Sequence, residues 1–345
     1  MPTPELFRYR KIRTFNYPIL GANVSAAVQT VNFDIKDFLQ KETLARLFVR
    51  VSGNIIIAGA GAGVATGRDT EQLITNLILQ TAPSLGIVQQ NNINGRDLRN
   101  FSVFDKGYAN RAAAIVDAAG TTAVDFIVPI TFKIPGSVNP IEFCLPLAAF
   151  EMAQLQITVG TRDQLFTGGT NTWDVSGLQI QVFADVDDGV AGSFHAVEHL
   201  VRSFPITASQ TDFPLLGLDA GYIYTHLLFE MERDNVRDDT LLNALTIQSA
   251  GRIWLPQGEA NAAMIRQWNR ETHVNNSAES LLGLYFIPAL RDGMYKRAID
   301  CLDAKLDIKA DVTLGGGTTR TLKLYARRII PLAINAVGTK AAVAA

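Results

Sequence analysis

A glycine-rich segment near the start of the chain has the residue types of a dinucleotide-binding turn. The stretch NIIIAGAGAGVATG runs from Asn54 to Gly67 and places alternating glycines after a run of branched apolar residues. In a nucleotide-binding βαβ unit, such glycines let a pyrophosphate approach the backbone and the N-terminus of a following helix. The spacing here gives GxGxG and GxGxxxG but never GxGxxG, and residues 77–90 hold no acid to bind a ribose. We therefore predict a loop of small residues that packs closely against a neighbour, with no nucleotide cofactor.

A second motif suggests metal chemistry. Residues 195–199 read HAVEH, so His195, Glu198 and His199 match HxxEH, the inverted zinc-protease signature. On a helix, the two imidazoles would share one face and the glutamate would act as general base. However, the motif stands directly before LVRSFPI, which has the pattern of a strand, and Pro205 follows within a few residues. We interpret the three residues as polar linker or strand residues without zinc, and a β-sandwich metal-dependent hydrolase stays open as an alternative.

The stretch ADVDDG, residues 184–189, is similar to the start of a calcium-binding loop. Its glycine is the fifth residue counted from Asp185 rather than the sixth, and Ala196 stands at the twelfth position, where a bidentate glutamate belongs. The chain contains no GxSxG nucleophile elbow and no GxxxxGK[ST] phosphate loop. We therefore predict a solvated turn here, and no metal ligand, catalytic residue or cofactor in the chain.

The N-terminal segment ELFRYRKIRTF mixes basic residues with apolar and aromatic ones. The basic residues are Arg8, Arg10, Lys11 and Arg13. Segments of this composition suit an anionic lipid surface, a nucleic acid or a groove on a neighbouring subunit, and a disordered tail is the alternative. We predict that the four residues contact a membrane or a neighbouring subunit.

The composition excludes several classes of protein. Of the 345 residues, 48% are apolar and 19% are charged, and the formal net charge is −2. These values argue against disorder and against an overall attraction to nucleic acid, so we expect no specific nucleic-acid partner. The N-terminus lacks the apolar segment of a signal peptide, and no uncharged run reaches the roughly 20 residues that span a bilayer. Cys144 and Cys301 form no CxxC pair, so we expect two reduced, buried thiols in a protein made in a cytoplasm.

Strand signals dominate the chain. Segments such as GLQIQVFADV and RTLKLYARRIIPL alternate apolar with polar residues, and clusters of Gly, Asn and Asp separate them. The alternation predicts that Leu178, Ile180 and Val182 point into one core, and Leu322 and Leu324 into another. Only EQLITNLIL, EANAAMIRQWNRE and DGMYKRAIDCL read as short helices, which are too few for a βαβ architecture. The fold is therefore predicted to be mainly antiparallel β.

The two halves of the chain repeat one order of segments. DTEQLITNLILQTAP in the first half matches DDTLLNALTIQSAG in the second, DFIVPITF matches LYFIPAL, and LQITV matches LDIKA. Each half then ends with a Gly/Thr-rich turn and a last alternating strand, so the shared order favours an internal duplication. We predict two β domains of two four-stranded sheets each, at residues 23–190 and 191–332. A basic arm at residues 1–22 precedes them, and a tail at residues 333–345 follows.

Tandem eight-stranded sandwiches are the architecture of two jelly rolls. On these features the chain resembles the double jelly-roll major capsid proteins of tailless icosahedral bacteriophages with an internal membrane, the tectivirus and corticovirus lineage. The resemblance extends from about Asn23 to Leu332 and rests on three features. They are the basic arm, FDIKDFLQKETLARLFVRVSGNIII as the first two strands, and the tandem β units. It implies an all-β fold of two tandem jelly rolls with few short helices.

The same resemblance implies a structural function without catalysis. The chain would form homotrimers whose six jelly rolls make a pseudo-hexagonal capsomer of an icosahedral virus shell, and it would be located in the virion. Its partners would be further copies of itself, neighbouring capsomers, minor capsid and penton proteins, and the internal viral lipid membrane, toward which the arm would point. The alternatives are the metal-dependent hydrolase named above and a jelly-roll carbohydrate-binding or spike protein.

Overall fold

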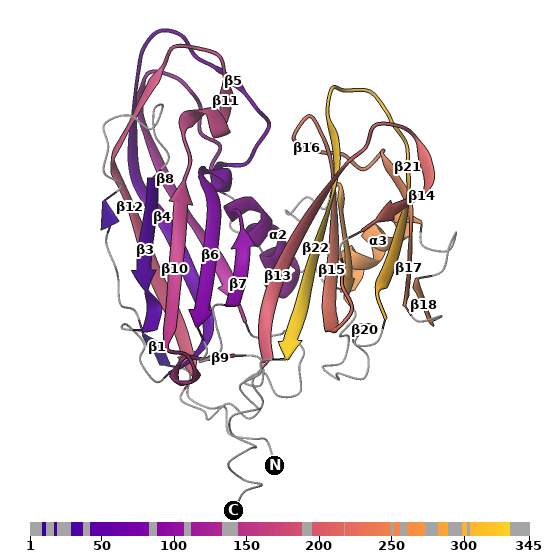
Figure 1. Ribbon diagram of the computed structural model, residues 1–345. Coiled ribbons are helices and arrows are strands. Elements are labelled where there is room, and N and C mark those ends of the chain that lie inside the picture. Colours follow the sequence, from indigo (N-terminus) through magenta and orange to yellow (C-terminus); the bar gives the residue numbers. More distant parts are fainter. Residues whose placement is uncertain are drawn as a thin grey trace, which may run out of the picture.

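The computed structural model consists mainly of antiparallel strands arranged as two sandwiches that stand side by side (Figure 1). The structure describes residues 9–11, 17–18, 29–36, 42–82, 88–106, 112–132, 144–187, 195–216, 218–249, 252–255, 261–272, 282–288, 299–301 and 304–331. The prediction of an all-β fold of two tandem eight-stranded jelly rolls is confirmed.

The first sandwich has two sheets. In spatial order, the first sheet contains β1 (Tyr9–Lys11), β12 (Thr172–Asp187), β4 (Thr43–Ala58) and β8 (Gly120–Thr131). The second contains β3 (Gln29–Asp34), β10 (Met152–Val159), β6 (Ile74–Ala82) and β7 (Val88–Ile93). The shorter elements are β2 (Tyr17–Pro18), β5 (Val64–Ala65), β9 (Leu145–Pro146), β11 (Phe166–Thr167) and the 3-10 turns η1 (Thr70–Leu73), η3 (Leu147–Ala149) and η4 (Arg162–Gln164). Of these, β2 and β9 extend the first sheet, and β5 pairs with β11.

The second sandwich repeats this plan. One sheet contains β13 (His195–Pro205), β22 (Arg320–Pro331) and β15 (Tyr222–Arg233), with β16 (Val236–Arg237), β19 (Leu284–Pro288) and β20 (Ile299–Cys301) also paired to β15. The other contains β14 (Gln210–Leu215), β21 (Leu306–Val312), β17 (Leu242–Ser249) and β18 (Arg252–Leu255). The order β22-β15-β19 therefore corresponds to β12-β4-β8, and β14-β21-β17-β18 to β3-β10-β6-β7. The matching segments of the sequence are thus equivalent strands.

The two sandwiches share a sheet. Strand β13 of the second sandwich pairs in parallel with β7 of the first, through His199 and Asn91. This pairing joins four strands of the first sandwich and six of the second into one ten-stranded sheet. The sequence predicted separate four-stranded sheets, because a single parallel bridge between distant strands has no local sequence signal.

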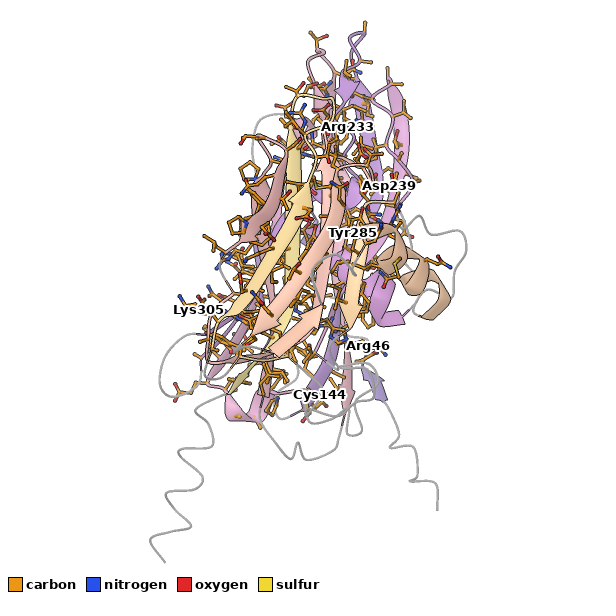
Figure 2. All side chains as sticks on the ribbon, turned by 90° about the vertical axis from the view of Figure 1, so that its right-hand side faces the viewer. Arg46, Cys144, Arg233, Asp239, Tyr285 and Lys305 are labelled. Carbon is orange, nitrogen blue, oxygen red and sulfur yellow. The ribbon has the colours of Figure 1, made fainter. Side chains whose placement is uncertain are left out.

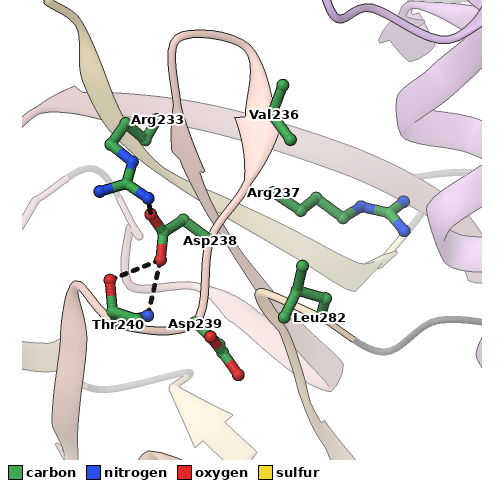
Figure 3. A pocket seen from close by; sticks show the side chains of 7 residues that line it. All are labelled: Arg233, Val236, Arg237, Asp238, Asp239, Thr240 and Leu282. Carbon is green, nitrogen blue, oxygen red and sulfur yellow. Dashed lines mark hydrogen bonds and ion pairs between the residues drawn. The ribbon is translucent and has the colours of Figure 1, made fainter. Parts of the chain in front are cut away.

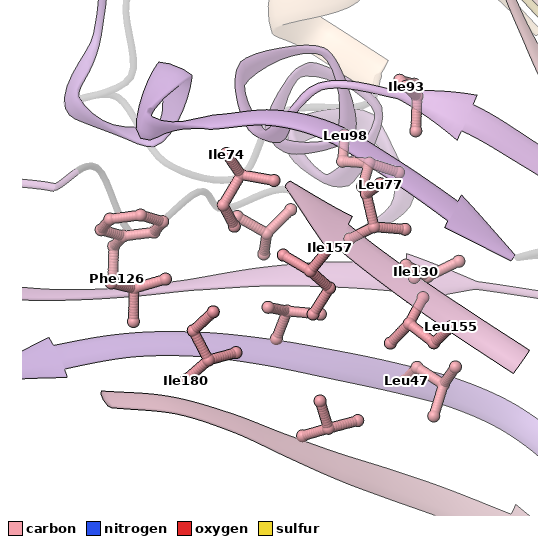
Figure 4. Packing of buried hydrophobic residues seen from close by; sticks show 14 of the residues in the cluster. Leu47, Ile74, Leu77, Ile93, Leu98, Phe126, Ile130, Leu155, Ile157 and Ile180 are labelled. Atoms are coloured by element: carbon pink, nitrogen blue, oxygen red, sulfur yellow. The ribbon is translucent and has the colours of Figure 1, made fainter. Parts of the chain in front are cut away.

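Alternation along the strands places the apolar side chains in two cores. Leu178, Ile180 and Val182 are buried in the first core, and Leu322 and Leu324 in the second, so the predicted core residues are confirmed. In the first core, side chains from both sheets face each other across the sandwich (Figure 4). Such interdigitated packing is the main source of stability in a β sandwich.

The helix predictions were partly wrong. EQLITNLIL is not a helix: it forms the end of η1 and most of β6. In β6, buried Leu77 and Leu79 alternate with half-buried neighbours, and the strand pairs on both sides. The helix α3 (Ala262–Thr272) confirms the prediction for EANAAMIRQWNRE. In DGMYKRAIDCL, the part that the structure describes is strand β20.

The helix α2 (Gly95–Lys106) was not predicted. Its N-terminal residues carried a usable signal, because Asn94 and Asp97 cap the helix reciprocally. The Asp97 backbone N–H donates to Asn94 Oδ1 over 2.9 Å, and Asn94 Nδ2 donates to Asp97 Oδ2 over 2.6 Å. This arrangement differs from a capping box only in that Asp97 accepts from the side-chain amide of Asn94 and not from its backbone N–H.

The predicted domain limits stay predictions, because residues 188–194 and 333–345 lie outside the described part of the chain. Strands β1 and β2 fall within the predicted arm and pair with β12, in the position that β13 holds beside β22. None of the described helices is long and apolar enough to cross a bilayer.

We expect the inward and outward residues of β10 to differ sharply in their effect on stability. Ile157→Ala removes buried methyl groups from the first core and should lower the free energy of unfolding by about 2–5 kcal/mol. Gln156→Ala, on the outward face of the same strand, should cost less than about 1 kcal/mol. Denaturant unfolding at one fixed protein concentration measures both values, and similar losses would contradict the assigned register.

Candidate functional site

The glycine-rich segment forms a loop that packs against the connection between β11 and β12. A Cβ atom on Gly63 would lie 2.4 Å from the Arg162 guanidinium and 2.8 Å from the Gly168 carbonyl oxygen, so only glycine fits there. The Gly63 backbone N–H donates to Asp117 Oδ2 over 2.7 Å. The prediction of a loop that packs closely against a neighbour is confirmed.

The side chain of Asp117 holds this loop in place through its hydrogen bond with the Gly63 backbone. Its carboxylate also accepts hydrogen bonds from Trp173 Nε1 over 2.9 Å and from Arg162 Nε over 3.1 Å. Burial alone would raise the pKa of Asp117, but the hydrogen bonds from Arg162, Trp173 and Gly63 prevail and lower it to about 2. The acid therefore stays ionised and has a structural role.

The HAVEH residues lie on strand β13, which confirms their interpretation as strand residues. His199 is buried, and its Nε2 accepts a hydrogen bond from Arg327 Nε over 3.2 Å. Glu198 points to the opposite face, where it forms an ion pair with Arg328 over 2.5 Å. Burial, followed by the charge of Arg327, lowers the pKa of His199 well below its ordinary value. The helical arrangement that zinc requires is therefore not formed, and the side chain of His195 lies outside the described residues.

The predicted turn at ADVDDG is wrong for the part that the structure describes. Strand β12 continues to Asp187, because Val186 and Asp187 still pair with β4. Asp185 forms an ion pair with Arg46 over 2.8 Å. Within the described ranges, no three His, Cys, Asp or Glu residues gather in a way that could hold a metal ion.

The largest group of buried charges lies where α2 meets the second sandwich (Figure 1). We call it the charged seam. Its members are Arg96, Asp97 and Asn100 on α2, Glu230 and Glu232 on β15, Arg237 on β16, and Lys323 and Tyr325 on β22. The first three belong to one sandwich and the other five to the second, so the seam connects the two halves of the chain.

Glu230 is at the centre of the charged seam and is 0% exposed. Arg96 Nη2 contacts its Oε1 over 2.9 Å, and Arg237 Nε contacts the same oxygen over 2.8 Å. Asn100 Nδ2 donates to Oε2 over 3.0 Å, and the Tyr325 hydroxyl also hydrogen-bonds this oxygen. Both carboxylate oxygens thus have donors from both sandwiches.

The pKa values of the two acids Glu230 and Asp97 shift in opposite directions, although burial alone would raise both. Burial would raise the pKa of Glu230, but the charges of Arg96 and Arg237 outweigh it and hold the pKa well below its usual range. For Asp97, burial prevails over the attraction of Lys323 and raises the pKa to about 6. The Tyr325 hydroxyl lies 2.7 Å from Asp97, and burial raises its pKa as well.

An apolar contact continues the charged seam. The Phe101 ring of α2 lies 5.6 Å from Tyr325 and 4.9 Å from His199, both edge-on. The Arg327 guanidinium stacks over the same ring at 5.6 Å. His199 therefore belongs to the contact between the sandwiches, which gives this motif residue a structural role.

A small pocket opens beside the charged seam (Figure 3). It has a volume of about 240 Å³, and its lining includes Arg233, Arg237 and Asp238. Asp238 is held by Arg233 over 2.7 Å and accepts hydrogen bonds from the backbone N–H and hydroxyl of Thr240. The pocket has a second acid, Asp239, which pairs with Arg266, so both acids already have partners within the chain.

The structure describes only residues 9–11 and 17–18 of the predicted arm. Arg10 and Lys11 lie in β1, opposite Asp185 and Ala184 of β12. Arg8 and Arg13 lie outside the described residues. Strand β1 stands at the lower end of the first sandwich, opposite the end that carries β5 and β11 (Figure 1).

Solved structures share this fold, although no protein-family model and no curated protein matches the chain. A chain of Sulfolobus turreted icosahedral virus has a TM-score of 0.66 at 12% identity, over 95% of this chain and 91% of that chain. The major capsid protein P2 of bacteriophage PM2 has a TM-score of 0.59 at 13% identity, over 94% and 98%. A chain of the PBCV-1 virus capsid has a TM-score of 0.59 at 11% identity, over 96% and 97%. The likeness establishes a double jelly-roll fold along nearly the whole chain.

We expect the buried and exposed ion pairs to differ in their contribution to stability. Glu230→Gln removes the buried counter-charge of Arg237 and one of the three acids that pair with Arg96, and it should cost about 3–5 kcal/mol. Asp125→Asn breaks the exposed pair with Arg50 and should cost at most about 1 kcal/mol. Thermal unfolding at pH 7 compares the two variants, and equal losses would contradict the assigned role of the seam.

The loss in Glu230→Gln should also depend on pH. The folded state lowers the pKa of Glu230 from its ordinary value of 4.5, so its ionisation stabilises the fold above that pH. This contribution is lost as the pH falls through the lowered pKa of the folded state. The difference in stability between Glu230→Gln and the unchanged chain should therefore shrink as the pH falls below 4.5. A difference that grows on acidification would be the opposite result.

Proposed function

We propose that this chain is the major capsid protein of an icosahedral virus and has no catalytic role. The observation that carries the proposal is the likeness over nearly the full length of both chains to the PM2 major capsid protein and the PBCV-1 capsid chain. Because the match includes both sandwiches in tandem, it concerns the whole building unit.

The charged seam supports the proposal that the chain serves as a rigid building unit of a virus shell. A capsid lattice needs subunits of constant shape, and two sandwiches joined by a flexible linker would not supply one. Here α2 buries Arg96 and Asn100 against Glu230, and β7 pairs with β13. The two sandwiches therefore form one body.

The proposed assembly unit is a homotrimer in contact with neighbouring capsomers, minor capsid proteins and penton proteins. Three chains with two sandwiches each place six similar units around one axis, a shape that tiles a hexagonal lattice. Side-by-side packing would also cover edge strands that otherwise invite uncontrolled pairing.

The basic residues Arg8, Arg10, Lys11 and Arg13 are proposed to face the particle interior, where an internal lipid membrane would lie. Their support is the placement of β1 at the end opposite the loop that Asp117 anchors (Figure 1). We place the protein in the virion shell after its synthesis in the host cytoplasm.

The hydrolase alternative has lost its geometric basis, because Glu198 and His199 point to opposite faces of a strand and Arg327 occupies His199 Nε2. Stoichiometric zinc in protein purified without chelator would restore it. Glycan binding by a soluble trimer that does not assemble would favour the carbohydrate-binding or spike alternative.

Light scattering of the purified protein should give about three times the mass of one chain. Electron microscopy of the source particles, with antibody raised against the chain, should label a pseudo-hexagonal shell. A monomer whose mass does not change with concentration would contradict the capsid function.

Replacement of Arg8, Arg10, Lys11 and Arg13 by serine should impair lipid association or particle assembly. Each basic residue near an anionic membrane contributes about 1 kcal/mol, so the effect should weaken at high salt. Flotation with anionic vesicles and particle yield measure it, and circular dichroism checks the fold. Normal yields of lipid-containing particles would exclude the arm from the mechanism.

A further inference from the structure

The helices α2 and α3 occupy equivalent places in the two sandwiches. Asn94 and Asn261 begin them in the same way, since the N–H of Leu98 and that of Ile265 donate to the respective asparagine carbonyl oxygens. Leu98 and Ile265 are both buried. The residue that follows each of these is an arginine, and each arginine pairs with an acid that stands just before one of the two equivalent strands β6 and β17. The pairs are Arg99 with Glu71, over 3.4 Å, and Arg266 with Asp239.

The outward faces of the two helices have different environments. On α2, Arg96, Asp97 and Asn100 are buried against the second sandwich. Their equivalents on α3 are Ala263, Met264 and Gln267, which are all exposed. Met264 is 63% exposed, a high value for a large apolar side chain. At the side of the second sandwich, α3 projects from the strands near Tyr285 and Asp239 (Figure 2).

The surface that receives α2 also has an equivalent. In the second sandwich, Leu228 stands between Tyr325 and Phe286, and the first sandwich buries all three. The equivalence follows from the two prolines of the repeated segments: Pro288 pairs with His226, and Pro129 pairs with Phe48.

His226 of β15 therefore corresponds to Phe48 of β4. Two residues further along these strands, Leu228 corresponds to Arg50. Arg50 stands between Gln181 and Ile127 in the same register. Ile127 is 37% exposed, and Arg50 carries an ion pair with Asp125 and contacts Gln181. The chain therefore has two copies of the helix surface and two copies of the sheet surface. The face of α2 and the sheet face around Leu228 contact each other within the chain, whereas the face of α3 and the sheet face around Arg50 are exposed.

We propose that α3 of one chain docks on the outward face of β12, β4 and β8 of a second copy of this chain. Met264 then lies beside Gln181, as Asp97 lies beside Tyr325 within the chain, and Arg50 and Ile127 follow on the two neighbouring strands of the same face. This inference rests on the proposed function and names the two surfaces through which its trimer forms.

The chemistry of the two surfaces fits a contact between separate chains. Ala263, Met264 and Gln267 carry no charge, so α3 buries no ionised group when it docks. Methionine adapts its shape to an irregular surface, and Ile127 adds an exposed apolar side chain to the face on which α3 docks. Arg50 already has Asp125 as its counter-charge over 2.7 Å, so docking leaves no isolated charge.

The contact is head-to-tail, because the two surfaces belong to different sandwiches. Such contacts close into a ring when their rotations add up to a full turn. Suppose that each contact, within a chain or between chains, rotates one sandwich by one-sixth of a turn relative to the next. Six sandwiches, and therefore three chains, then close the ring. The trimer and its pseudo-hexagonal outline then follow from one repeated geometry.

Cysteine cross-linking tests the proposal on the full chain. Met264→Cys and Ile127→Cys are placed together in one chain, which is treated with a short bis-maleimide and run on a denaturing gel. Cys144 and Cys301 are buried, and the unchanged chain under the same treatment measures their background reaction. The double variant should give covalent dimers and trimers. An equimolar, co-expressed mixture of the two single variants should give dimers only, because each chain then carries one of the two thiols.

Controls separate this contact from others. Leu216 is 72% exposed and lies on neither surface, so Leu216→Cys with Ile127→Cys should give no cross-link above background. Met264→Asp should raise the concentration of half-dissociation by about tenfold or more, since it buries an unpaired carboxylate, and Leu216→Asp should not.

Cross-linking of Met264→Cys alone would indicate a symmetric contact between two α3 helices and would overturn the proposal. Trimers in light scattering without a cross-link in the double variant would also overturn it and leave the capsid function in place. A chain that stays monomeric would instead contradict the capsid function itself. Because Met264 and Ile127 are exposed, the thermal unfolding of the variants should match that of the unchanged chain.

Discussion

The ionised carboxylate of Glu230, buried where the two sandwiches meet, is the constraint on which the rest of the structure depends. A fully buried charge is tolerated only when its oxygens are matched by donors, and here the donors come from both halves of the chain. Arg96 and Asn100 lie on α2 of the first sandwich, and Arg237 lies on β16, the strand that pairs with the strand of Glu230. Moving either sandwich would take Arg96 and Asn100 away from Glu230, and Glu230 and Glu232 away from Arg96. The orientation of the sandwiches, and with it the shared sheet through β7 and β13, is therefore fixed.

Much of the fold could be predicted because strand signals are local. The alternation at Leu178, Ile180 and Val182 specifies which face of β12 is buried, whatever the partner strands are. The repeated order of segments then gave two similar units, since each segment recurs in an equivalent strand. Val128-Pro129 and Ile287-Pro288, for example, occupy β8 and β19, which hold the same place in the two sandwiches.

The rest could not be predicted, because it depends on partners far along the chain. Glu230 is separated from Arg96 by 134 positions and from Asn100 by 130. In the sequence, the charged first turn of α2 is indistinguishable from a solvated helix face. EQLITNLIL has the composition of a helix and becomes a strand because β10 and β7 pair with it on both sides. His199 shows the same limit, because the motif does not reveal the strand that separates Glu198 from His199, nor the pairing with Arg327, which is 128 positions away.

The internal repeat gives the chain two equivalent helices, one with a charged outward face and one with an uncharged outward face. Within a chain, the two surfaces are tethered, so their high effective concentration offsets the cost of desolvating several charges. The buried charges in turn reject any other orientation, which gives a building unit of constant shape. Between chains there is no tether, and the same buried charges would weaken the contact by their desolvation cost. The equivalent positions on α3 are accordingly uncharged, and Met264 stands where α2 has Asp97. If α3 docks between chains as proposed, the difference in charge between the two equivalent helices follows from the absence of a tether in that contact.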